Sequence, residues 1–270
     1  MAKGISLHIG LNFVDPNHYS GWDGKLTAAE YDANDMYLIT KSQGLHPTKL
    51  IRNEATRGAV ISAIKKAAAT LTANDFFVIS YSGHGGQLPD INGDEDDGMD
   101  ETWCLFDGEV VDDELSNLWS AFQKGVRILV ISDSCHSGTV VKLARSLERS
   151  KTEYAPKFMP SEIASTTYFN NKEFYDNILE NVKDVKAQDI QASVKLISGC
   201  QDNQNSYDGT FNGQFTGALK RIWNGGKFNG NYFSFYKQIM NLLPPEQTPN
   251  YYNVGQLNQS FDNQKPFSIK

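Results

Sequence analysis

The sequence predicts an α/β fold with a mostly parallel central sheet and helices on both of its faces. Short apolar runs rich in β-branched residues, such as 75–82 and 126–132, stop at Gly, Ser or Asp. Runs of this kind are typical of buried parallel strands. Amphipathic segments alternate with these runs along the chain, and that alternation favours a parallel sheet covered by helices.

Each expected element follows from its own pattern. Apolar runs predict strands at 5–11, 49–52, 75–82, 102–106, 126–132, 194–198 and 250–255. Helical periodicity predicts helices near 27–43, 56–71, 113–122, 172–188, 214–223 and 233–243. The expected inward positions of the first helix include Leu26, Tyr31, Met36 and Leu38. Asp112 or Asp113 is the expected N-cap of the third helix.

Composition narrows the class of protein. The chain has 270 residues with 40% hydrophobic and 21% charged content, which predicts a globular protein with a sizeable core. A net charge of −7 argues against nucleic acid as a partner. It fits attraction of basic peptides or cations, or ordinary acidic solubility. Three cysteines without paired spacing indicate a reducing, cytoplasmic location. We expect no leader segment and no membrane association.

His84 and Cys135 form the most informative pair in the sequence. Each follows the end of an apolar run, where chemistry collects in open α/β sheets. An imidazole near a thiol can accept its proton and leave a nucleophilic thiolate. Taken singly, either residue could be structural. A buried cysteine often acts as a small hydrophobic residue, and a lone histidine is usually structural. His136 is a weaker candidate base, since its side chain should point away from its neighbour. Backbone N–H groups of Gly85 and Cys135 are the expected oxyanion donors.

Several long motifs around this pair resemble those of one peptidase family. They are Tyr81–Gly86, Asp90–Glu101, Val111–Leu115, Asp133–Gly138 and Ser198–Ser206. Their order and content resemble the metacaspases and bacterial orthocaspases, which are caspase-like cysteine peptidases of clan CD, family C14. The resemblance covers about 4–138 and 193–256. It implies a caspase-like three-layer sandwich in a single domain, 1–270. Within it, 1–142 would be the large-subunit-like part, 143–190 an insertion or linker, and 191–270 the small-subunit-like part.

The resemblance also implies an activity. A Cys135–His84 dyad would cleave peptide bonds after Arg or Lys, and the partners would be peptide or protein substrates with a basic P1 residue. Asp32, Ser82 and Asp133 match the family's S1 positions, and two carboxylates there would pair with a guanidinium or ammonium. Without the resemblance, Asp32 could equally be a solvated helix carboxylate. The family often has a cysteine where this chain has Ala29.

The acidic segment 90–101 raises the question of a metal. Its spacing is similar to an EF-hand, but Glu95 stands where the sharp turn requires glycine. The resemblance instead implies a calcium site at Asp100, Asp112 and Asp113. Lys142 occupies the position of a fourth acidic ligand, and its charge opposes calcium binding. We therefore expect that no cofactor is required and that calcium is dispensable or weakly activating.

Residues 143–190 are polar, punctuated by prolines, and show little periodicity before about 170, so we interpret them as a surface insertion. Arg145, Arg149 and Lys151 in it match the expected S1 preference and are the candidate self-cleavage sites. The resemblance implies a monomer. A non-proteolytic calcium-binding or scaffold module on the same fold is the alternative function. A related peptidase for basic side chains or an acyl transferase of the clan also stays open.

Overall fold

The structure is a computed structural model that describes residues 2–91, 93, 98–135, 155–183, 185–200 and 206–270. Its main sheet has six strands in the order β2-β1-β3-β7-β8-β9, and the first five run parallel while β9 is antiparallel to β8. The strands are β1 (Gly4–Gly10), β2 (His46–Ile51), β3 (Phe76–Ser82), β7 (Arg127–Asp133), β8 (Ser193–Ser198) and β9 (Asn250–Gly255). This confirms the predicted α/β class.

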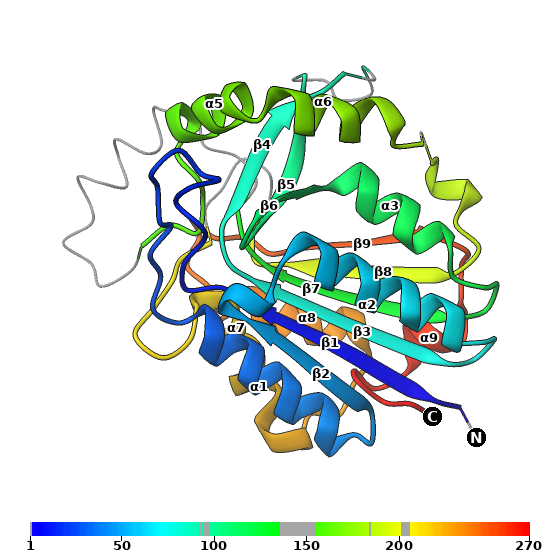
Figure 1. The fold of residues 1–270 in the computed structure, drawn as a ribbon. Coiled ribbons are helices and arrows are strands. Elements are labelled where there is room, and N and C mark those ends of the chain that lie inside the picture. The colour runs from blue at the N-terminus through cyan, green and yellow to red at the C-terminus, as the bar shows by residue number, and fades with distance from the viewer. Residues whose placement is uncertain (1, 92, 94–97, 136–154, 184, 201–205) are drawn as a thin grey trace.

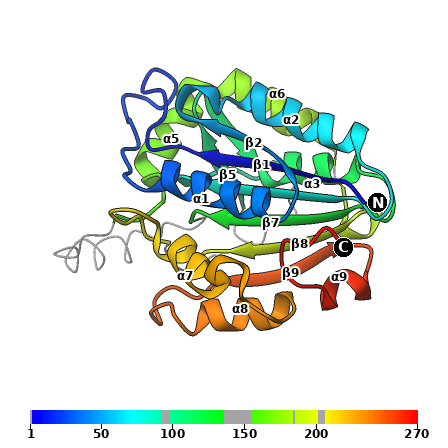
Figure 2. The same cartoon turned by 90° about the horizontal axis from the view of Figure 1, so that it is seen from below.

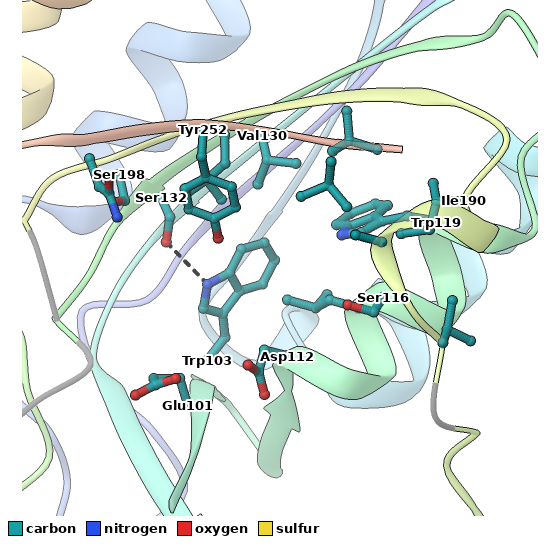
Figure 3. A pocket seen from close by; sticks show the side chains of 17 residues that line it. Glu101, Trp103, Asp112, Ser116, Trp119, Val130, Ser132, Ile190, Ser198 and Tyr252 are labelled. Atoms are coloured by element: carbon teal, nitrogen blue, oxygen red, sulfur yellow. Dashed lines mark hydrogen bonds between the residues drawn. The ribbon is translucent and has the colours of Figure 1, made fainter. Parts of the chain in front are cut away.

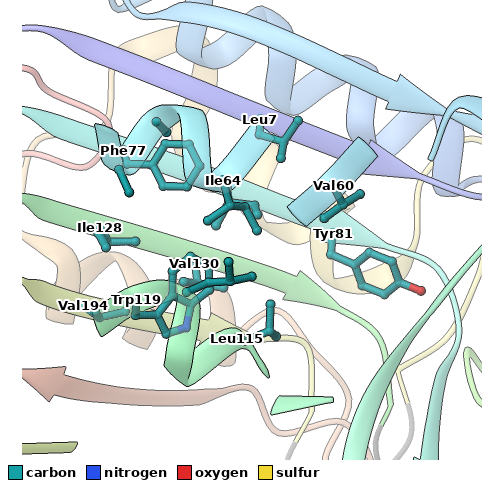
Figure 4. Packing of buried hydrophobic residues seen from close by; sticks show 14 of the residues in the cluster. Leu7, Val60, Ile64, Phe77, Tyr81, Leu115, Trp119, Ile128, Val130 and Val194 are labelled. Carbon is teal, nitrogen blue, oxygen red and sulfur yellow. The ribbon is translucent and has the colours of Figure 1, made fainter. Parts of the chain in front are cut away.

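Helices cover both faces of this sheet (Figures 1 and 2). One face carries α2 (Arg57–Thr70) and α3 (Asp112–Ser120), and the other carries α1 (Ala29–Ser42), α7 (Gln214–Trp223), α8 (Tyr232–Met240) and α9 (Gln259–Asn263). Because the strands are buried on both faces, alternate residues of one strand feed two separate cores. Phe77 packs with Ile64 of α2 and Trp119 of α3, as Figure 4 shows, whereas Phe76 belongs to the opposite cluster.

The inward face of α1 differs from the expected one. Leu26, just before the helix, and Met36 are buried, but Tyr31 is 55% exposed and Leu38 is 52% exposed. Small residues face the sheet instead, because α1 lies very close to β1. A Cβ atom on Gly10 would lie 2.7 Å from the Cβ of Ala33, which leaves no room for larger side chains. Helical periodicity in the sequence cannot predict how closely a helix packs against a neighbouring strand.

The start of α3 also differs from the prediction. Val111 is the N-cap residue, and Asp112 and Asp113 lie in the first turn of the helix. The carboxylate of Glu114 reaches back to accept a hydrogen bond from the Val111 N–H at 3.3 Å. The N-cap prediction was therefore wrong, because a Glu at the third helical position satisfies the free N–H from within the helix.

A second, antiparallel sheet lies beside the ends of the main strands. It contains β4 (Gly85–Pro89), β5 (Met99–Leu105) and β6 (Gly108–Val111), and the predicted strand 102–106 overlaps β5. Two helices, α5 (Ser161–Asn170) and α6 (Lys172–Asn181), pack over it (Figure 1). Short 3₁₀ turns are η1 (Arg52–Glu54), η2 (Ala187–Asp189) and η3 (Asn224–Gly226). The helix predicted at 172–188 ends at Asn181 in the structure, and α5 was not predicted.

The surface interpretation of 143–190 is wrong for part of that range. Lys157, Phe158 and Met159 are buried. They form a short extended segment against the carboxyl ends of the main strands, as backbone hydrogen bonds from Met159 and to Lys157 show. In the part of the chain that the structure describes, no helix is long and apolar enough to cross a membrane.

Candidate active site

Strand register brings the two predicted catalytic turns together. Ser82 at the end of β3 pairs with Asp133 at the end of β7, and His84 and Cys135 each follow two residues later. Gly85 packs directly on the carbonyl oxygen of Cys135, where a side chain at position 85 would not fit. The two turns are therefore in contact, as the strand-end argument required.

His84 is held as a neutral imidazole. Its Nε2 lies 3.0 Å from the carbonyl oxygen of Gly24, so Nε2 carries the proton and donates a hydrogen bond to that oxygen. Burial lowers the pKa of His84 to about 4, although the Gly24 carbonyl opposes this effect. The other nitrogen, Nδ1, is buried and has no hydrogen-bond partner among the described residues. Trp22 packs edge-on against the ring at 4.7 Å. A neutral imidazole with a free Nδ1 is ready to accept a proton.

Cys135 is buried beside Ser206, which comes after strand β8 in the sequence. The Cys135 thiol lies 3.1 Å from the carbonyl oxygen of Ser206, and the Ser206 N–H donates to the same sulfur. Cys200 lies in the same small cluster, and its thiol contacts the carbonyl of Ser134. The segment after β8 therefore fixes the position of the predicted nucleophile.

Two backbone N–H groups converge on one oxygen atom at this site. The N–H of Gly85 donates to the carbonyl oxygen of Lys157 at 3.1 Å, and the N–H of Cys135 donates to the same oxygen at 3.0 Å. Gly85 and Cys135 are the two donors predicted for the oxyanion. Preorganised donors at such distances are suited to stabilise negative charge on a carbonyl oxygen.

The side chain of Lys157 ends among the three predicted S1 residues. Its Nζ lies 3.0 Å from Asp32 Oδ2, 2.9 Å from Ser82 Oγ and 3.2 Å from Asp133 Oδ2. Lys157, Asp32 and Asp133 are all buried. Asp32 comes from α1, Ser82 from β3 and Asp133 from β7, so the fold gathers them from three elements.

The charges in this pocket depend on one another. Burial alone would lower the pKa of Lys157, but the carboxylates of Asp133 and Asp32 raise it overall, so the ammonium stays charged. Burial raises the pKa of Asp32 to about 6, with Lys157 opposing the rise and Asp133 adding to it. Two carboxylates without a cation would repel each other strongly in a buried site. The pocket therefore favours a cation between the two carboxylates.

The backbone around Lys157 is extended like that of a bound peptide. The Lys157 N–H donates to the Ser206 carbonyl at 2.9 Å, and the Met159 N–H donates to the Gly85 carbonyl at 2.8 Å. Isolated β-bridges join Pro156 to Tyr207 and Phe158 to Gly85. Pairing of an extended segment with exposed backbone edges is a common mode of peptide recognition.

Sequence reasoning missed several residues that shape this pocket. Asp32 Oδ1 accepts from Asn212 Nδ2 at 2.9 Å and from the Gly213 N–H at 3.1 Å. The hydroxyls of Ser206 and Thr216 each donate to Asp133 at 2.6 Å. A signal for Lys157 existed: Pro156, Phe158, Met159 and Pro160 make an apolar island in an otherwise polar stretch. Residues 206–216 carry no comparable periodic pattern.

The predicted calcium ligands come from two elements, β5 and α3. Among the described residues, no group of three or more His, Cys, Asp or Glu side chains is placed to hold a metal ion. Asp100 is buried in β5, whereas Asp112 and Asp113 open α3. Thr102 of β5 pairs with Val111 just before α3, so the two elements are neighbours, and the calcium expectation stays a prediction. Lys142, His136 and the self-cleavage candidates Arg145, Arg149 and Lys151 lie outside the described residues.

A cavity of about 300 Å³ lies away from the predicted dyad, between α3 and the β8–β9 edge of the sheet (Figure 3). Trp103 forms part of its wall, and the indole N–H donates to Ser132 Oγ at 3.1 Å. Ser132 Oγ is in turn 3.0 Å from Ser134 Oγ, next to the predicted nucleophile. Neither His84 nor Cys135 lines this cavity.

Comparison with known proteins agrees with this geometry. A family model described as metacaspase, peptidase C14 domain, matches residues 18–144. Metacaspase-1A of Aspergillus oryzae is 30% identical over 255 residues, which cover 85% of this chain and 59% of that protein. Metacaspase-1 of Coccidioides immitis is 31% identical over 255 residues, or 85% of this chain and 54% of that protein. The chain belongs to the metacaspase family of C14 proteins.

A solved structure shares the fold over almost the whole chain. The crystal structure of protein GSU0716 from Geobacter sulfurreducens is 53% identical, with a TM-score of 0.93 and 99% coverage of both chains. By contrast, the chain spans between half and two thirds of the length of the fungal metacaspases named above. The likeness to those metacaspases therefore concerns the shared caspase-like region.

Proposed function

We propose that this metacaspase is a cysteine endopeptidase that cleaves after a basic P1 residue through a Cys135–His84 dyad. One observation supports this most strongly. The chain's own Lys157 has its ammonium between Asp32 and Asp133 while its carbonyl oxygen accepts from the Gly85 and Cys135 N–H groups. A P1 residue of a substrate needs both contacts at once, because one gives specificity and the other stabilises the transition state.

In the proposed reaction these groups act in sequence. The thiol of Cys135 attacks the P1 carbonyl carbon, and its proton passes to Nδ1 of His84. The resulting oxyanion is held by the two N–H groups that contact the Lys157 carbonyl. When the C–N bond breaks, the imidazolium returns the proton to the leaving amine. Water then hydrolyses the thioester with His84 again as the base, which releases the acid and restores the thiol.

Self-processing is part of this proposal, and the bond between Lys157 and Phe158 is the best-placed site. Its carbonyl lies against both oxyanion donors, and the backbone of Phe158 is close enough to influence the pKa of His84. The amine of Phe158 would be the leaving group beside the base. In the uncut chain Lys157 fills the pocket, so cleavage or displacement of this segment must precede attack on another protein.

Substitution of the dyad tests the activity. Cys135→Ala and His84→Ala should each reduce turnover of a P1-basic amide by at least about 10³-fold while the protein stays folded, as for other paired nucleophiles and bases. Cys104→Ala is a matched control, because Cys104 is also buried but belongs to a different hydrophobic cluster from Cys135. A peptidyl-arginine or peptidyl-lysine ketone should label Cys135 alone. Normal turnover by folded Cys135→Ala would refute the dyad.

A further inference from the structure

The pocket around the Lys157 ammonium has one oxygen for each N–H donor. Among the described residues, its acceptors are Asp32 Oδ2, Ser82 Oγ and Asp133 Oδ2, all between 2.9 and 3.2 Å from Nζ. A lysine ammonium has three N–H donors and no acceptor, so this set satisfies it completely. Resting on the proposed peptidase function, we propose that this metacaspase selects lysine over arginine at P1 and that glycine is required at position 213 to leave room for the ammonium.

The remaining oxygen atoms of the pocket are already in use. Asp32 Oδ1 accepts from Asn212 and from the Gly213 N–H, and Asp133 Oδ1 accepts from Ser206 Oγ at 2.6 Å. Asp133 Oδ2 also accepts from the Thr216 hydroxyl and N–H. These bonds hold each carboxylate so that it turns one oxygen toward the ammonium. A guanidinium binds best when it meets both oxygens of one carboxylate side by side.

An arginine would therefore be poorly matched here. Its planar head carries five N–H donors in a fixed fork, whereas three oxygens of the described residues face the site. The donors left over would be buried without partners, which costs about 1–3 kcal/mol for each unpaired group. The side chain of Lys157 is fully buried, so water has no direct access to satisfy them. Lysine and arginine carry the same charge, so the number of donors and acceptors is what distinguishes them as P1 residues.

Gly213 closes the pocket on the side of α7. A Cβ atom at this position would be closer to Lys157 Nζ than van der Waals contact allows, and it would lie 2.6 Å from Asp133 Oδ2. The backbone of Gly213 has φ −56° and ψ 153°, which any residue adopts. The requirement for glycine is therefore steric and concerns the space beside the ammonium. Gly217 on the same helix has no neighbour nearer than 3.5 Å to such an added atom.

Two peptide amides taken from the chain's own sequence test the selectivity. Ala-Pro-Lys and Ala-Pro-Arg aminocoumarin amides reproduce residues 155–157 and differ only at P1. Both are assayed on one enzyme sample, so the fraction of molecules with an open pocket cancels from the ratio. We expect kcat/KM for lysine to exceed that for arginine at least about tenfold, from one buried donor left unpaired. Equal rates, or faster cleavage after arginine, would overturn the selectivity and leave the peptidase proposal standing.

A glycine pair tests the role of Gly213. Gly213→Ala should lower kcat/KM for the lysine amide at least about 100-fold, since it removes space from a buried ion-pair site. Gly217→Ala should stay within about threefold of wild type, because an added methyl there meets ordinary contacts. A thermal unfolding midpoint for each variant shows whether it folds. A folded Gly213→Ala with wild-type rates contradicts the assignment of Gly213.

The tethered segment supplies a measurement that does not depend on the Gly213 variant. In Lys157→Arg the P1 residue is presented in the same backbone, and intact mass over time should show self-processing at least about tenfold slower than in wild type. Lys157→Gln, with no charge for the pocket, should not be processed at that bond. Self-processing of Lys157→Arg at the wild-type rate would overturn the selectivity. If neither amide is cleaved and the peptidyl-lysine ketone labels no Cys135, the peptidase proposal itself fails.

Discussion

Two groups of acidic residues in this chain look alike in sequence but differ in space. Asp32 and Asp133 lie about 100 positions apart, yet both contact one ammonium. Asp100, Asp112 and Asp113 lie within 14 positions, yet form no group able to hold a metal ion. Asp133 ends β7, and Asp32 lies in α1, which packs against the neighbouring strands β1 and β3. In the second set, Asp100 lies in β5, and Asp112 and Asp113 begin α3. Packing of a helix and an extended segment at the carboxyl ends of the strands, rather than nearness in sequence, assembles the charged site around Lys157.

Removing one carboxylate from each group should give the largest contrast. Asp32→Asn leaves a P1 ammonium with one full charge partner, and breaking a buried pair in this way costs about 3–5 kcal/mol. We expect kcat/KM for a P1-lysine amide to fall at least about 100-fold. Asp112→Asn is the matched variant from the other group, and it should change this constant less than about threefold. Similar losses in both variants would erase the distinction between the two groups.

A third buried carboxylate sharpens the comparison, because hydroxyls rather than an ammonium contact it. Glu109 Oε2 accepts from Thr102 Oγ1 at 2.5 Å, and the Tyr175 hydroxyl lies 3.4 Å from Oε1. Burial raises the pKa of Glu109 to about 7, against 4.5 for the ordinary group. Its contribution to stability is therefore complete below pH 4.5 and is lost as the pH rises through 7.

Glu109→Gln should therefore gain stability relative to wild type as the pH rises. The gain between pH 5 and pH 8 should reach up to about 3 kcal/mol in the free energy of unfolding, from the size of the pKa change. Urea unfolding of both proteins at the two pH values measures it. A stability difference that is the same at pH 5 and pH 8 would show that Glu109 is ionised in the fold at both.

Calcium should have the smallest effect. Because the described carboxylates form no metal-holding group, we expect that excess chelator changes the rate of lysine-amide cleavage less than about threefold. Calorimetry with calcium should give no heat of binding in the micromolar range. Activity that vanishes in chelator and returns with micromolar calcium would contradict the separation drawn between the two acidic groups.

Much of the fold and of the reacting groups could be predicted from local pattern. The runs ending at Ser82 and Asp133 are apolar on both faces, so their burial, and the placement of His84 and Cys135 beyond them, followed from the sequence. Gly85 was predicted as an oxyanion donor for the same reason. The close packing of α1 on Gly10 could not be predicted, because it depends on the distance between two elements rather than on either one.

The presence of Lys157 in the S1 pocket could not be predicted either, because it also depends on contacts between distant parts of the chain. Lys157 lies in a stretch whose polar composition indicates a surface loop, and a buried lysine is rare unless it is paired. Its partners Asp32 and Asp133 are 125 and 24 positions away, and no local period links them. The residues that orient the carboxylates, Asn212 and Thr216, come from a segment with no motif.

The intact mass of the full chain, followed over time, tests most directly whether Lys157 is bound as a P1 residue. We predict one cut in the wild type, which gives a fragment ending at Lys157 and a fragment beginning at Phe158. The same bond should stay intact in Cys135→Ala and in Lys157→Gln. An uncut wild type that nonetheless cleaves a lysine amide, or the same fragments from Cys135→Ala, would contradict the account.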